Sequence, residues 1–68
     1  MRPAQIIRVL KAERLEQGLF KKTLGRAAGL SNSTVGSIED KGHMPTIDTL
    51  CSLAKVLGLE LVLRKVKP

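Results

Sequence analysis

The segment of residues 21–40 constrains the fold of this chain more than any other part of the sequence. Leu24 and Ala28 lie four residues apart, and Val35 and Ile38 lie three apart, which is the spacing of one helix face. Between the two pairs, the run Gly-Leu-Ser interrupts the apolar pattern, and its glycine can form a tight turn. The segment therefore predicts a short helix, a turn and a second short helix that packs back on the first.

The second of these helices has an outer face without large apolar side chains. Its residues are small or polar: Asn32, Ser33, Thr34, Gly36 and Ser37. Short hydrogen-bonding side chains on a helix can read base edges in the major groove of DNA. We therefore expect base contacts from Asn32, Ser33, Thr34 and Ser37.

Each of these residues also has a second interpretation. Asn32 can bond an adenine edge through two hydrogen bonds, or it can cap the helix locally. The two serines can bond bases or phosphates, and Thr34 can offer its methyl group to thymine or face solvent.

The positive charge of the chain indicates an anionic partner. Twelve Lys and Arg against six Asp and Glu give a net charge of +6 over 68 residues. This balance suits an anionic polymer or a membrane surface, and a charge that only keeps the domain in solution is the alternative. We expect phosphate contacts from Lys21, Lys22, Arg26, Lys41 and His43.

The sequence contains no arrangement of residues typical of an enzyme, a metal site or a cofactor site. The single His and single Cys have no partners at catalytic or metal-ligand spacing. Since Cys51 is the only cysteine, an intrachain disulfide is excluded and a reducing, cytoplasmic compartment is favoured. We expect its thiol to be buried or half-buried beside Leu50 rather than to act as a redox switch. No apolar run reaches the ~18 residues of a membrane span.

The helical pattern predicts a single all-α domain of four helices. The predicted helices cover residues 3–16, 21–28, 31–40 and 46–57, with Ser31 and Thr46 as N-caps and Gly58 as the final stop. The expected core consists of Leu10, Leu19, Leu24, Ala28, Val35, Ile38, Leu50, Leu53 and Leu57.

Two segments follow from this pattern, a domain of residues 1–58 and a tail of residues 59–68. In the tail, Leu59, Leu61 and Leu63 alternate as in a strand, although a helical face also fits the segment. The preceding glycine and the alternation favour the strand. A single strand in a helical domain has no partner within the chain for its backbone groups. We therefore expect it to pair with its copy in a homodimer and to bury its leucines there.

A set of small and apolar residues within residues 18–58 carries a family resemblance. These are Leu24, Ala28, Gly29, Val35, Ile38 and Glu39, followed by the segments 45–50 and 53–58. Their spacing resembles that of the Cro and phage-repressor helix-turn-helix family, also called the XRE family. The resemblance implies that the second helix of the motif is the recognition helix, and that two subunits bind a palindromic site in double-stranded DNA.

The resemblance also implies roles for single residues. Asn32, Ser33 and Ser37 match the base-facing positions of the family, and Lys21 matches a phosphate-binding position at the start of the preceding helix. The loop of residues 41–46 would lie along the DNA backbone. Arg14 and Glu39 match an internal ion pair that holds the recognition helix in place.

Two positions depart from the usual family pattern. Phe20-Lys21 replaces the common Ser-Gln, so the residue before the helix cannot cap it, and Lys21 cannot accept a hydrogen bond from the recognition helix. Gly25 replaces a common Ala, which costs about 1 kcal/mol of helix propensity but allows the two helices to cross closely.

These observations predict a dimeric, sequence-specific transcriptional regulator that acts as a repressor. The chain ending also resembles a subgroup of antitoxin repressors related to HipB, in which a strand mediates dimerisation. The alternative is therefore an antitoxin that neutralises a toxin protein and regulates its own operon. A third possibility is a degenerate motif used only for protein contacts.

Overall fold

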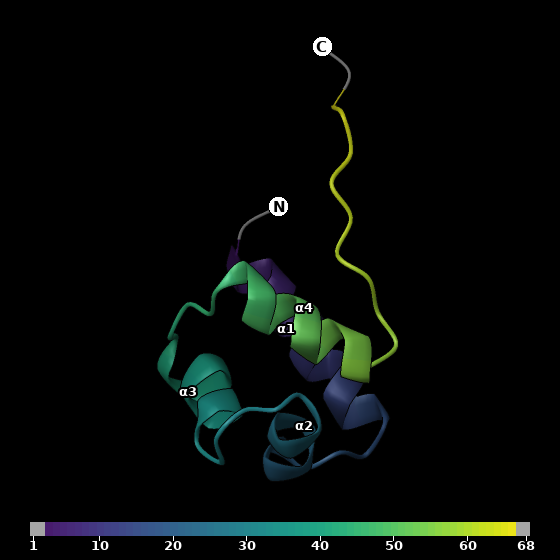
Figure 1. The fold of residues 1–68 in the computed structure, drawn as a ribbon. Coiled ribbons are helices and arrows are strands. Elements are labelled where there is room, and N and C mark those ends of the chain that lie inside the picture. Colours follow the sequence, from purple (N-terminus) through teal and green to yellow (C-terminus); the bar gives the residue numbers. More distant parts are fainter. Residues whose placement is uncertain (1–2, 67–68) are drawn as a thin grey trace.

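A computed structural model describes residues 3–66 of the chain and shows four helices (Figure 1). They are α1 (Pro3–Glu16), α2 (Lys21–Ala27), α3 (Thr34–Lys41) and α4 (Ile47–Val56), and the described residues contain no strand. The all-α prediction is confirmed. The first two residues of the expected domain and the last two of the expected tail lie outside the described part.

Three of the four helices begin where the sequence predicts, and the third helix, α3, does not. It begins at Thr34 rather than just after Ser31, and Ser33 occupies the N-cap position. The Ser31 hydroxyl bonds the Thr34 hydroxyl at 2.6 Å instead of capping the helix. The prediction of Ser31 as the N-cap is therefore wrong, because its side chain is used within the turn.

The core lies where α2 packs on α3 and α4, and α1 packs on α3. Its buried members are Leu10, Leu24, Val35, Ile38, Leu50, Leu53, Ala54 and Leu57. Leu19 and Ala28 were also expected there, but they are only half-buried at its edge. Ala54 was missed, although it lies four residues after Leu50 and so shares its face.

The same periodicity explains the position of the cysteine. Cys51 is exposed, and the expectation of a buried or half-buried thiol is wrong. Leu50, Leu53 and Ala54 are the buried residues of α4, and the residue after Leu50 is rotated by about 100° from that face.

Two local contacts agree with the sequence predictions: the cap of α4 and the close approach of α2 and α3 at Gly25. The Thr46 hydroxyl accepts a hydrogen bond from the Thr49 N–H at 3.2 Å, so it caps α4. In α2, Gly25 is buried, and a Cβ atom placed on it would lie 3.3 Å from Cγ2 of Val35. The absence of a side chain at Gly25 therefore allows α3 to approach α2 closely.

The tail after α4 differs from the expected strand. Figure 1 shows it extending away from α2 and α3, and residues 59–66 form neither helix nor strand. Leu59 is half-buried against the core, and its N–H donates to the carbonyl of Ala54 at 2.8 Å. Leu61 and Leu63 are exposed. A strand requires a ladder partner, and the described residues of this single chain provide none.

Candidate nucleic-acid interface

The turn between α2 and α3 sets which side of α3 faces outward. Gly29 has a φ of +75°, a left-handed value that residues with a side chain rarely adopt, and Leu30 N–H donates to the Gly25 carbonyl at 2.8 Å. Val35 and Ile38 then point into the core. The opposite face of α3 is left outward, as Figure 1 shows for the α2–α3 pair at one end of the molecule.

The expected base-reading residues lie at the start of this outward face. Asn32 and Ser33 are exposed in the turn that leads into α3, while Thr34 and Ser37 are half-buried in its first turn. The Ser33 side chain makes no capping hydrogen bond. The Thr34 hydroxyl is bonded to Ser31, which makes Thr34 a less available base contact than its neighbours.

A buried ion pair anchors α3 from the inner side. Arg14 donates from Nε and Nη2 to the two carboxylate oxygens of Glu39, each at 2.8 Å, and from Nη1 to the Leu19 carbonyl at 2.7 Å. The two side chains are only 7% and 5% exposed. This arrangement connects α1, the loop before α2 and α3, so it fixes the orientation of the helix that presents Asn32 and Ser33.

The expected phosphate-binding residues are spread around α2 and α3. Lys22 and Arg26 are exposed and line a shallow hollow of about 280 Å³ along α2, together with Thr23 and Ala27. Lys41 is exposed at the end of α3, and His43 is exposed in the loop that follows. These four cationic or titratable side chains are accessible to an anionic partner.

Lys21 differs from the other four because it already has a partner. Its Nζ lies 2.5 Å from Oδ2 of Asp40, and the two side chains are 41% and 47% exposed. The hydrogen bond from Lys21 lowers the pKa of the Asp40 carboxyl below its usual value, and the positive charges of Lys21, Lys11 and Arg14 act in the same direction. Asp40 was missed in the sequence, although its spacing from Gly36 and Ser37 places it on the same face of α3.

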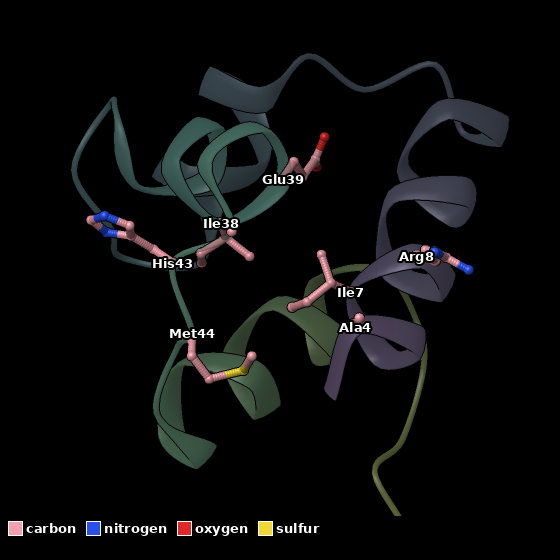
Figure 2. A pocket seen from close by; sticks show the side chains of 8 residues that line it. Ala4, Ile7, Arg8, Ile38, Glu39, His43 and Met44 are labelled. Atoms are coloured by element: carbon pink, nitrogen blue, oxygen red, sulfur yellow. The ribbon is translucent and has the colours of Figure 1, made fainter. Parts of the chain in front are cut away.

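A second hollow lies between α1, α3 and the loop after α3 (Figure 2). Its volume is about 220 Å³. Figure 2 shows Ile7 and Ile38 pointing toward each other there, while the guanidinium of Arg8 and the ring of His43 point away. The side chains that face one another are therefore apolar.

Two other kinds of feature, a metal site and a membrane span, are absent from the described residues. Residues 3–66 contain no group of three or more His, Cys, Asp or Glu side chains placed to hold a metal ion. None of the helices in that range is long and apolar enough to cross a membrane.

Comparison with known proteins identifies the family. A helix-turn-helix family model (HTH_3) matches residues 10–63, which span the second half of α1, all of α2, α3 and α4, and part of the tail. No curated protein gives a significant match. The chain belongs to the Cro/C1-type (XRE) helix-turn-helix family of DNA-binding transcriptional regulators.

Proposed function

We propose that this protein is a repressor that binds a palindromic operator in double-stranded DNA as a homodimer. The observation that supports this best is the arrangement of α3. Arg14 and the core residues hold one side of the helix, and Asn32 and Ser33 stand exposed at its start. Occupation of a promoter by such a dimer would block transcription in the cytoplasm.

The residues of the reading face have separate roles in this proposal. Asn32, Ser33 and Ser37 read base edges, and Thr34 contributes its methyl group. Lys22, Arg26 and Lys41 neutralise phosphates, His43 contacts the DNA backbone, and together they fix the register of the domain. Members of the family are generally regulators rather than enzymes, and the proposal assigns no catalytic role to this chain.

Selection of bound duplexes from a random library tests the DNA part of the proposal. We expect a single enriched site made of two inverted half-sites about 34–36 Å apart or a multiple of that spacing. Recovery of unenriched sequence would contradict sequence-specific binding.

The base-reading role of Asn32 is tested with the selected duplex. Asn32→Ala should weaken binding to it by about 1–3 kcal/mol and leave binding to random duplex almost unchanged. Ser52→Ala, which removes a polar group from α4, is the matched control and should change neither. Equal losses by Asn32→Ala on both duplexes would contradict base reading.

The dimer part of the proposal is supported by the exposed apolar tail. Leu61, Val62, Leu63 and Val66 are 40%, 61%, 102% and 90% exposed. Full burial of one such side chain contributes about 1.5–3 kcal/mol. Leu59 N–H makes the last backbone hydrogen bond among the described residues. Pairing of two tails would satisfy the later groups and bury the leucines.

A point substitution tests the dimer better than removal of the tail, because Leu59 packs on its own domain. Leu63→Glu should convert the dimer to a monomer in sedimentation experiments, since strand alternation places Leu61 and Leu63 on one face. Val62→Glu, on the other face, should leave the dimer intact. A dimer unaffected by Leu63→Glu would contradict this use of the tail. A wild-type monomer that co-purifies with a toxin would favour the antitoxin alternative.

A further inference from the structure

Asp40 lies on the outward face of α3, together with the residues proposed to read DNA. It follows Gly36 by four residues and Ser37 by three, so the three positions share one side of the helix. Its Oδ2 lies 3.8 Å from the position that a Cβ atom on Gly36 would occupy. The carboxylate therefore lies over the reading face. Glu39, the other acidic residue of α3, is turned inward to Arg14.

A carboxylate in this position opposes binding to any polyanion. DNA carries one negative charge per about 1.7 Å of its axis, and charges interact over about 10 Å at 0.1 M salt. Asp40 is ionised at neutral pH, since an aspartate carboxyl has an ordinary pKa of 3.8 and the hydrogen bond from Lys21 lowers the pKa of this one further. Its charge is balanced in the free protein by the Lys21 ammonium 2.5 Å away.

The pair also removes Lys21 from the set of cations that can neutralise phosphates. To donate to a phosphate, the Lys21 ammonium must give up its contact with the Asp40 carboxylate. The carboxylate then faces the DNA without a partner. This cost is offset only where the DNA offers a hydrogen-bond donor to the carboxylate. In the major groove, the exocyclic amino group of cytosine is the donor that acidic side chains accept from.

We propose that Asp40 is a specificity-determining residue that withholds Lys21 from the phosphates of arbitrary DNA. At the operator, a cytosine amino group takes the place of Lys21 at the carboxylate, and the ammonium is released to a phosphate. This inference rests on the proposed function of α3 as the reading helix. It assigns a role in discrimination to an ion pair that connects the start of α2 to the end of α3.

Asp40→Asn tests the proposal with a labelled random-sequence duplex and with the selected operator. Release of one lysine should steepen the slope of log K against log salt on random DNA by about 0.9. If the variant and the wild type bind equally at 1 M salt, this difference in slope corresponds to about eightfold tighter binding by the variant at 0.1 M salt. Affinity for the operator should not rise to the same degree, so the ratio of the two affinities falls.

Two controls separate this mechanism from a simple change of charge. Glu60→Gln removes one negative charge from an exposed tail position, and should change the slope on random DNA little. In a Lys21→Met background, Asp40→Asn should give no larger gain than Glu60→Gln, because there is no ammonium to release. Circular dichroism would show that each variant is folded, as expected for exposed positions.

The outcomes are distinct. A gain from Asp40→Asn that is equal on both duplexes, matches that of Glu60→Gln, or persists without Lys21 would overturn the inference and leave the proposed function intact. Failure of the wild-type chain to bind any duplex would refute the proposed function itself.

Discussion

The buried pair of Arg14 and Glu39 gives the sharpest prediction about stability. Arg14→Met would keep most of the side-chain volume but remove all three hydrogen bonds of the guanidinium. Both oxygens of Glu39, which is 5% exposed, and the carbonyl of Leu19 would lose this donor. Removal of one partner of a buried ion pair costs about 3–5 kcal/mol, because the other charge is left uncompensated.

This cost is large for so small a domain. At about 0.05–0.15 kcal/mol per residue, a chain of 68 residues has a free energy of unfolding of about 3–10 kcal/mol. We therefore expect Arg14→Met to lose about a third or more of its free energy of unfolding at 25 °C, and to be mostly unfolded if the wild type lies at the lower end of this range. Because the chain has no Trp or Tyr, urea unfolding followed by far-UV circular dichroism at a fixed protein concentration is the suitable assay.

Two further variants make the reasoning refutable. Arg8→Met replaces an exposed arginine of the same helix and should change the free energy of unfolding by no more than about 0.5 kcal/mol. The double variant Arg14→Met/Glu39→Met replaces both charges with apolar side chains and should be more stable than Arg14→Met alone. A loss below about 1 kcal/mol for Arg14→Met, or a double variant that is less stable than either single one, would refute this account of the pair.

Three other predictions follow from single contacts. Thr46→Ala should lower the free energy of unfolding by about 1 kcal/mol through loss of the α4 cap, and an equal loss from the exposed Thr23→Ala would argue against capping. Gly25→Val should cost about 1–3 kcal/mol from overpacking against α3, whereas Gly36→Val has more room, so similar urea midpoints for the two variants would contradict the close approach. In a carboxyl NMR titration, the pKa of Asp40 should lie below the usual 3.8 and rise in Lys21→Met. A lowered pKa in the folded state means that the pair stabilises the fold at neutral pH, so its contribution to stability should disappear as the pH falls through the pKa of the folded Asp40. A pKa of Asp40 that Lys21→Met leaves unchanged would exclude the pair in solution.

Local sequence signals predicted the elements whose ends are fixed by local chemistry. Pro3, Thr46 and Gly58 mark helix boundaries through backbone geometry and capping, which act within a few residues. The predicted starts of α1 and α4 therefore agree with the structure, and the predicted start of α2 at Lys21 agrees although Phe20 provides no side-chain cap. The start of α3 was misplaced because the Ser31 hydroxyl bonds the Thr34 hydroxyl within the turn instead of capping the helix.

Most features of the candidate site that the sequence did not predict are contacts between side chains distant in sequence. Lys21 was expected to be free for a phosphate, and the structure instead places it beside Asp40, nineteen residues later. No local periodicity encodes that contact, since it depends on how α2 crosses α3. The pairing of Arg14 with Glu39 was expected only through the family resemblance, for the same reason.

The sequence by itself determined the helices, the apolar faces of α2, α3 and α4, and the glycine turn, because these depend on spacing and on backbone conformations available to single residues. It also determined the positive charge and the polar side of α3. Only the tertiary structure decided which charges are paired, that Leu59 packs on its own domain, and that Leu61 and Leu63 remain exposed. These properties depend on distances between elements, which the packing of α2 on α3 and α4 and of α1 on α3 sets.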